Sequence, residues 1–154
     1  MIIRKAEERD IPAVGNLLLQ VCHVHAEGRP DLFQDGARKY TDEQLAAILR
    51  EENRPVLVAV DESDRVLGYA FCILERRAGA FHPHRTLYLD DLCVDETGRG
   101  QGVGTALYEA VVALARELGC YNVTLHVWNC NEKAMKFYDR LGMQCRQMEL
   151  ETIL

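Results

Sequence analysis

The sequence lacks the features that mark membrane proteins and disulfide-rich secreted proteins. No apolar run approaches the ~20 residues that a membrane-spanning helix needs, and the first residues, Met1–Glu7, contain no signal-peptide core. The six cysteines include no Cys-x-x-Cys pair, and most of them lie in apolar patterns, which favours reduced thiols in the core. From these absences we expect a cytoplasmic protein that does not associate with membranes.

Positive charge and metal-ligand clusters are also scarce. The 154 residues carry 24 acidic and 18 basic side chains, a net charge of −6, which disfavours nucleic acids as partners and favours cationic substrates. The pairs His23/His25 and His82/His84 would lie on different faces of a helix, and no third ligand is evident, so we expect no metal. No repeat or low-complexity tract divides the chain, and residues 1–154 are expected to form a single domain.

A glycine-rich loop separates a strand-like run, Leu87–Val94, from the most regular helical pattern in the chain. The loop reads Arg99-Gly100-Gln101-Gly102-Val103-Gly104-Thr105. Backbone N–H groups at a helix N-terminus favour negative charge, and glycine lets an anion approach the backbone. The loop has no Gly-Lys-Ser/Thr ending, and a dinucleotide fingerprint would need a third glycine at Leu107. The loop is therefore predicted to bind a phosphate of another ligand class, with a plain tight turn as the alternative.

Periodicity and turn signals predict the order of the elements. The chain should begin with a strand and two helices, continue with three antiparallel strands and a helix, and close with a strand, a helix and an extended run. The long helix after the glycine loop requires the next strand to run parallel to the one before the loop. Strands are expected at 2–4, 55–60, 66–73, 87–94 and 121–127, helices at 10–28, 41–49, 103–118 and 131–142, and the extended run at 143–154.

Two motifs and this order of elements resemble one known family. Arg99, Gly102 and Gly104 are similar to Arg/Gln-x-x-Gly-x-Gly/Ala, the pyrophosphate-binding loop of the GNAT superfamily of acyl-CoA-dependent N-acyltransferases. Residues Asn131–Gly142 resemble the Asn-x-x-Ala-x-x-Phe-Tyr-x-x-x-Gly segment of that superfamily. The resemblance implies an α/β (α+β) GNAT fold: a central mixed, mostly antiparallel sheet of six to seven strands with about four helices, in the order β-α-α-β-β-β-α-β-α-β.

The resemblance also implies a reaction, direct transfer from acetyl-CoA to a primary amine in a ternary complex, without a metal. Tyr138 would lie near the thioester sulfur and assist the departing thiolate, with a core tyrosine as the alternative. Asp90 and Asp91 are the candidate bases, and the sequence does not decide between them or exclude that both only bind cationic groups. Cys93 is expected to be a buried thiol and not a nucleophile. Acetyl-CoA would be bound by Leu92, Cys93, Val94, Arg99, Gly100, Gln101, Gly102, Val103, Gly104, Thr105, Asn131 and Lys133.

The acceptor amine is less well defined by the sequence. In this fold the segment between the first two helices commonly lines the acceptor site, which points to Arg29, Phe33 and Tyr40. The acid pair and the net charge favour a small cationic amine or amino acid, whereas Arg29 could hold a substrate carboxylate. A protein lysine or N-terminal amine as acceptor, and a non-catalytic acyl-CoA sensor module, stay open. A homodimer is possible through the terminal strand or an exposed edge.

Overall fold

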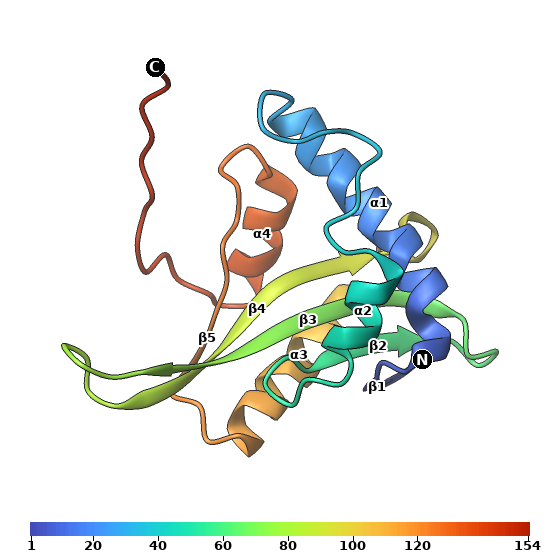
Figure 1. Cartoon of the computed structure of the whole chain (residues 1–154), viewed down its shortest axis with the longest axis horizontal. Coiled ribbons are helices and arrows are strands. Elements are labelled where there is room, and N and C mark those ends of the chain that lie inside the picture. The colour runs from blue at the N-terminus through green and yellow to red at the C-terminus, as the bar shows by residue number, and fades with distance from the viewer.

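A five-stranded mixed sheet organises residues 1–154, all of which the computed structural model describes (Figure 1). The strands follow each other across the sheet in sequence order, with antiparallel neighbours from β1 to β4 and β5 parallel to β4. The strands are β1 (Ile2–Lys5), β2 (Val56–Val60), β3 (Val66–Arg77), β4 (His84–Val94) and β5 (Asn122–Thr124). The helices are α1 (Ile11–Gly28), α2 (Asp42–Ile48), α3 (Val103–Glu117) and α4 (Glu132–Arg140), with short 3₁₀ turns η1 (Glu8–Asp10) and η2 (Glu96–Gly98). No helix has the length and apolar character needed to cross a membrane.

Local sequence signals explain where the shorter helices begin. The Thr41 hydroxyl accepts a hydrogen bond from the Gln44 backbone N–H at 3.2 Å, and the Gln44 side chain accepts one from the Thr41 backbone at 2.8 Å. This reciprocal capping box starts α2, as the sequence predicts. The Asn131 side chain accepts from the Ala134 backbone at 3.1 Å and starts α4.

Apolar side chains fill a separate core on each face of the sheet. α1 and α2 cover one face, where Leu18 and Val58 are fully buried. α3 covers the other face, where Leu107 and Val111 are fully buried. Because every residue of β2 is buried, this strand has apolar side chains on both faces, as its unbroken apolar run predicts.

The sheet has fewer strands than the six to seven predicted. Residues 143–154, expected as a final extended run, form no strand, and β5 covers only part of the predicted 121–127. An alternating pattern favours an extended backbone, but a strand forms only where its N–H and C=O groups find partners. The tail finds none and runs away from the sheet (Figure 1), leaving Met148, Leu150 and Ile153 exposed.

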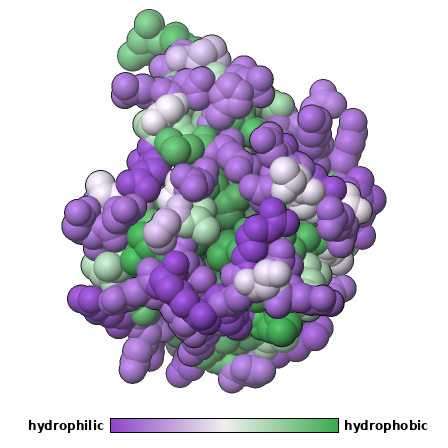
Figure 2. Space-filling view, turned by 90° about the vertical axis from the view of Figure 1, so that its right-hand side faces the viewer, coloured by the Kyte–Doolittle hydropathy of each residue, from purple (hydrophilic) through white to green (hydrophobic).

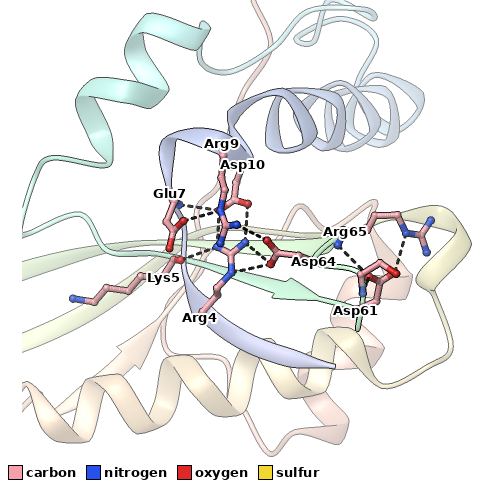
Figure 3. Close-up of polar contacts among 9 residues, drawn as sticks. Arg4, Lys5, Glu7, Arg9, Asp10, Asp61, Asp64 and Arg65 are labelled. Carbon is pink, nitrogen blue, oxygen red and sulfur yellow. Dashed lines mark hydrogen bonds and ion pairs between the residues drawn. The ribbon is translucent and has the colours of Figure 1, made fainter.

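An ion-pair cluster joins the first strand to the turn between β2 and β3 (Figure 3). Arg4 forms two hydrogen bonds with Asp10, at 2.7 and 2.9 Å, and two with Asp64, at 3.0 and 3.3 Å. Arg9 reaches the other oxygen of Asp64 at 2.7 Å. The surface that faces the viewer in Figure 2 is mostly hydrophilic, with hydrophobic residues between polar ones near the centre and also at the upper end and the lower edge. The cluster fixes the start of α1 against the sheet.

Candidate functional site

A bulge in β4 brings two acidic residues to the same face of the sheet. Asp91 is paired with Phe71 and Leu89 with Cys72, so Asp90 has no partner in β3. Leu89 belongs to the core under α3, whereas Cys93, four residues later, belongs to the core under α1. An uninterrupted strand would put both on one face, so the extra residue has reversed the alternation. Asp90 and Asp91 therefore both lie on the face that α1 and α2 cover.

Strands β4 and β5 separate at the bulge, whereas β3 and β4 stay paired as far as Val94. The parallel pairing of β4 with β5 ends at Tyr88 and Thr124. Just beyond the last pair, the Tyr88 hydroxyl and the His126 ring nitrogen Nδ1 lie 3.1 Å apart. From residue 89 to Val94, including the predicted cofactor contacts Leu92 and Cys93, β4 has no strand partner on its β5 side. Backbone groups on that edge are available to a ligand.

The two acidic side chains have different partners. Asp90 accepts hydrogen bonds from the Lys39 ammonium at 2.8 Å and the Tyr40 hydroxyl at 3.1 Å. Asp91 accepts one from the hydroxyl of Tyr69, a core tyrosine, at 2.9 Å. Burial raises the pKa of Asp91 to about 6, and the charge of Lys39 and the Tyr69 hydrogen bond only partly oppose this effect. Asp90 is thus in an ion pair, while Asp91 is a carboxyl group that can exchange a proton near neutral pH.

The glycine loop leaves the N-terminus of α3 open. Gly100 and Gly102 have φ angles of 79° and 78°, in the left-handed region that favours glycine. A Cβ at either position would meet no atom within 4 Å. Gly102 is the N-cap of α3, and no side chain caps this helix, so the N–H groups of its first turn, at Val103, Gly104 and Thr105, lack a side-chain acceptor. This geometry suits an anion.

The remaining loop residues pack back onto the fold. The Arg99 side chain donates to the Val94 carbonyl at 3.3 Å, and Gln101 donates to the Thr97 carbonyl at 3.1 Å. A Cβ at Gly104 would come within 3.3 Å of the Phe137 ring, so glycine there permits close packing of α3 against α4. The Arg99 side chain therefore lies against Val94, the last residue of β4.

α4 contributes a half-buried tyrosine on the α3 side of the sheet. Tyr138 packs with its ring centroid 6.3 Å from that of Tyr108, and its hydroxyl has no hydrogen-bond partner in the chain. Burial, with the charge of Asp91, raises the pKa of Tyr138 above the usual tyrosine value. Asn131 uses its side-chain oxygen to cap α4, which leaves its amide NH₂ free for a ligand, and Lys133 is exposed.

Cys93 is a buried thiol. Its sulfur donates to the Leu17 carbonyl at 3.5 Å, and burial raises its pKa to about 12. A thiol with this pKa is almost entirely protonated at neutral pH and is a poor nucleophile. This environment agrees with the prediction that Cys93 does not form an acyl-enzyme.

The three predicted acceptor residues fall into two groups. Tyr40 joins the acid pair through Asp90. Arg29 is engaged with Asp31 at 2.8 Å and with Glu151 of the C-terminal tail at 2.5 Å, and its guanidinium lies 5.8 Å from the Trp128 ring centroid. Its charge is therefore already compensated, which weakens the alternative that it holds a substrate carboxylate. Phe33 packs edge-on against Trp128, at 5.3 Å between centroids.

Sequence reasoning missed two residues of the acid cluster, Lys39 and Tyr69. Lys39 lies inside the segment expected to line the acceptor site, but its pairing with Asp90 joins residues 51 positions apart in the sequence. Tyr69 lies opposite Cys93 in the β3–β4 register, and it reaches Asp91 only because the bulge turns that carboxylate toward α1. A strand register could have indicated Tyr69, whereas no sequence signal indicated Lys39.

The comparisons with known proteins agree on one family. The model of the acetyltransferase (GNAT) family matches residues 18–143. A probable glucosamine 6-phosphate N-acetyltransferase of Drosophila melanogaster is 43% identical over 130 residues, and a thialysine N-epsilon-acetyltransferase of Bos taurus is 38% identical over 60. These matches cover 82% and 39% of this chain but only 52% and 35% of the two relatives, so the chain spans about half of their length or less.

Solved structures match over the whole length. A mutant of the BH1408 protein of Bacillus halodurans is 33% identical, with a TM-score of 0.95 over 100% of this chain and 99% of that one. A probable acetyltransferase, 23% identical, matches with a TM-score of 0.75 over 100% and 97% of the two chains, and supports the fold alone.

Proposed function

Because the chain belongs to the GNAT family of acetyltransferases, we propose that it transfers the acetyl group of acetyl-CoA to a primary amine by direct attack in a ternary complex. The observation that carries this proposal is the bulge in β4. It places a proton-accepting carboxylate, Asp91, on a sheet edge that is open from residue 89 to Val94. Three features that follow one another along the chain suit such a transfer. Asp91 can accept the proton of the amine, the open edge of β4 can bind the acyl donor, and the uncapped N-terminus of α3 can bind its phosphates.

The glycine loop and the free edge of β4 are the proposed acetyl-CoA site. The N–H groups at the start of α3, with Arg99, would bind the pyrophosphate. The backbone of Leu92–Val94 and the free amide of Asn131 would bind the pantetheine arm, with Lys133 near the same ligand. Acetyl-CoA supplies the activated acyl group as a thioester.

Asp91 is proposed as the base in preference to Asp90, because burial raises the pKa of Asp91 to about 6 whereas Asp90 is held in an ion pair with Lys39. A primary amine with a pKa of about 10 arrives protonated and must lose a proton before it can attack. At pH 7 a carboxyl group with a pKa of about 6 is mostly ionised and still accepts a proton more readily than an ordinary aspartate. Asp90, held by Lys39 and Tyr40, is assigned the role of orienting the incoming ammonium.

Tyr138 is the proposed hydrogen-bond donor to the departing thiolate. Its hydroxyl is unpaired in the chain, and its raised pKa keeps it protonated at neutral pH. Such a tyrosine stabilises the thiolate by donating a hydrogen bond, and the raised pKa disfavours complete proton transfer.

The acceptor is proposed to be a small amine, either cationic or an amino acid. The contact between Lys39 and Asp90 shows that a primary ammonium fits against the acid pair. The names of the relatives, which refer to glucosamine 6-phosphate and thialysine, also point to small amines. A protein amine and a non-catalytic acyl-CoA-binding module are the competing possibilities.

The test is mass-spectrometric detection of acetylated product from the purified protein, acetyl-CoA and a panel of polyamines, amino acids, amino sugars and peptides. Thiol-reactive assays are avoided because the chain has six cysteines. Turnover of one amine class that the Asp91→Asn variant loses would support the proposal. Binding of acetyl-CoA without turnover of any amine would contradict it and favour the binding module.

A further inference from the structure

One lysine of the protein already occupies the place that the proposal gives to an acceptor amine. The chain contains four lysines, Lys5, Lys39, Lys133 and Lys136. Only Lys39 contacts the acid pair, with its ammonium nitrogen 2.8 Å from an oxygen of Asp90. Lys136 pairs with Glu132 on the exposed face of α4. A primary amine of the chain itself is therefore held by Asp90, the residue that directly precedes the proposed base Asp91 in β4.

The anchoring of Lys39 lets its amine move while its backbone stays close to the site. The next residue, Tyr40, is fixed by hydrogen bonds to Asp90 and Arg54, the latter at 2.9 Å, and by packing against Phe71 with 5.7 Å between centroids. Residues 29–41, between α1 and α2, have no regular secondary structure. The Lys39 side chain is 43% exposed and has four rotatable bonds, so its nitrogen can pivot about a fixed backbone position.

We propose that Lys39 is a self-acetylation site: when no external amine occupies the acid pair, the protein transfers an acetyl group from acetyl-CoA to the Lys39 side-chain nitrogen. The inference rests on the proposed function, because it uses the same base and the same acyl donor. It goes further in naming an internal acceptor that competes with the external one.

The step balances without any further reactant. Asp91 removes one proton from the Lys39 ammonium, and the freed nitrogen lone pair forms a bond to the thioester carbonyl carbon. The carbon–sulfur bond breaks and its electron pair stays on sulfur. The nitrogen then loses a second proton and becomes an amide. One of the two protons ends on the CoA thiol and the other in solvent.

Burial and the neighbouring charge of Asp90 shift the pKa of the Lys39 amine in opposite directions. Burial alone would lower the pKa of Lys39, but the hydrogen bond and charge of Asp90 outweigh it and raise the pKa. The resting ammonium is thus stabilised against Asp90, and self-acetylation should be slower than transfer to a good external amine. The reaction should be most visible when no acceptor is present.

The experiment uses the full chain with acetyl-CoA alone, followed by trypsin and mass spectrometry. Trypsin does not cleave after acetyl-lysine, so modification converts the peptide Tyr40–Arg50 into Lys39–Arg50. We expect acetylation of Lys39 to exceed that of Lys136 by about tenfold or more, and Asp91→Asn to reduce it about a hundredfold, the scale of a lost general base. The rate per molecule should not change on tenfold dilution of the protein, because the transfer is intramolecular.

Two further arms separate this reaction from chemical acetylation. The Lys39→Arg variant keeps a positive charge at Asp90 but offers no amine. Its total acetylation should therefore fall by the amount found on Lys39 in the parent protein. The Lys136→Arg variant should keep the acetylation of Lys39 unchanged. An excess of the best external amine should slow modification of Lys39.

Each outcome decides the inference. Equal acetylation of all four lysines, or equal modification in Asp91→Asn, would show chemical acetylation and overturn it. Turnover of a free amine with Lys39 unmodified would overturn the internal acceptor while leaving the proposed function intact. If neither Lys39 nor any free amine is acetylated, the proposed function itself fails and the inference fails with it.

Discussion

Asp10 and Asp91 are both aspartates set against the folded core, yet their surroundings move their pKa values in opposite directions. Asp10, only 4% exposed, accepts two hydrogen bonds from the Arg4 guanidinium and one from the Glu7 backbone N–H at 2.8 Å (Figure 3). Burial alone would raise the pKa of Asp10, but these donors outweigh it and lower the pKa. Burial raises the pKa of Asp91 to about 6, because its direct side-chain partner is the uncharged Tyr69 hydroxyl.

The contrast separates a carboxylate held in its charged form from one whose raised pKa lies near neutral pH. A direct cation and a backbone donor hold Asp10 in its charged form. Arg4, which bonds both Asp10 and Asp64, joins β1 to the start of α1 and to the turn at Asp64. The Tyr69 hydroxyl offsets only part of the cost of burying the Asp91 charge. The charged and neutral forms of Asp91 are therefore close in free energy near neutral pH. We conclude that burial together with the nature of the partner decides which aspartate can exchange protons.

Removing the carboxylate of Asp91 should have the largest effect on activity. Asp91→Asn should lower kcat about 10²–10⁴-fold, because the incoming ammonium loses its base. In the unmodified protein, kcat/KM should rise with pH through about 6, as Asp91 loses its proton. Initial rates from pH 5 to 9, followed by mass spectrometry, measure both effects. An Asp91→Asn variant with an unchanged pH profile would remove Asp91 from the reaction.

The same substitution should not destabilise the fold at neutral pH. Because the pKa of Asp91 is higher in the folded than in the unfolded chain, its contribution to stability is present below the usual aspartate pKa and is lost as pH rises through about 6. At pH 7.5 the free energy of unfolding of Asp91→Asn should equal or exceed that of the unmodified protein. Urea titration checks this.

Asp10→Asn should instead weaken folding and spare the chemistry. Breaking a buried ion pair commonly costs about 3–5 kcal/mol, and we expect about 3 kcal/mol because Arg4 keeps its contact with Asp64. The stability that Asp10 contributes is present above the usual aspartate pKa and is lost as pH falls through its lowered folded value. Urea titrations at pH 7 and pH 3 should show a difference between variant and parent that shrinks in acid. Asp64→Asn, at a residue 43% exposed, is the control and should cost about 1 kcal/mol or less.

Tyr138→Phe tests the second half of the proposed reaction. Hydrogen bonds to charged groups are worth about 1.5–3 kcal/mol, so losing the hydroxyl should lower kcat roughly ten- to a hundredfold. The ring stays packed beside Tyr108, and KM for acetyl-CoA should change little. Tyr108→Phe, which removes a neighbouring hydroxyl, is the matched control. Equal kcat values for the Tyr138 variant and the parent would identify Tyr138 as a core residue.

The sequence predicted the family, the order of the elements and the position of the acid pair. Helix starts were predictable because caps such as Thr41 and Asn131 are local signals. The last strand was not predictable, because the extended run expected at 143–154 does not say whether a partner edge is present.

The difference between the acidic residues could not be predicted from the sequence. Asp10 and Asp91 have the same side chain. What distinguishes them is the Arg4 guanidinium, six residues earlier in the chain, in one case and a bulge in the other. Lys39, which pairs with Asp90, lies 51 residues earlier in the chain, in a segment without regular structure. Such contacts arise only from the tertiary arrangement.

Changing Tyr69, the hydrogen-bond partner of Asp91, should have the smallest effect on activity. It tests the comparison of Asp10 with Asp91 most directly. Tyr69→Phe keeps the aromatic packing against Phe71, 4.9 Å between centroids, but removes the hydroxyl that stabilises the charged form of Asp91. The pKa of Asp91 should rise further, by about half a unit to one unit, which corresponds to a hydrogen bond of about 1 kcal/mol. The acid limb of the pH–rate profile should move up by the same amount, so activity falls several-fold at pH 6 and recovers at pH 8.5. Recovery is the informative result, because damage to the core would lower activity at every pH. An unmoved acid limb would mean that a group other than Asp91 controls it.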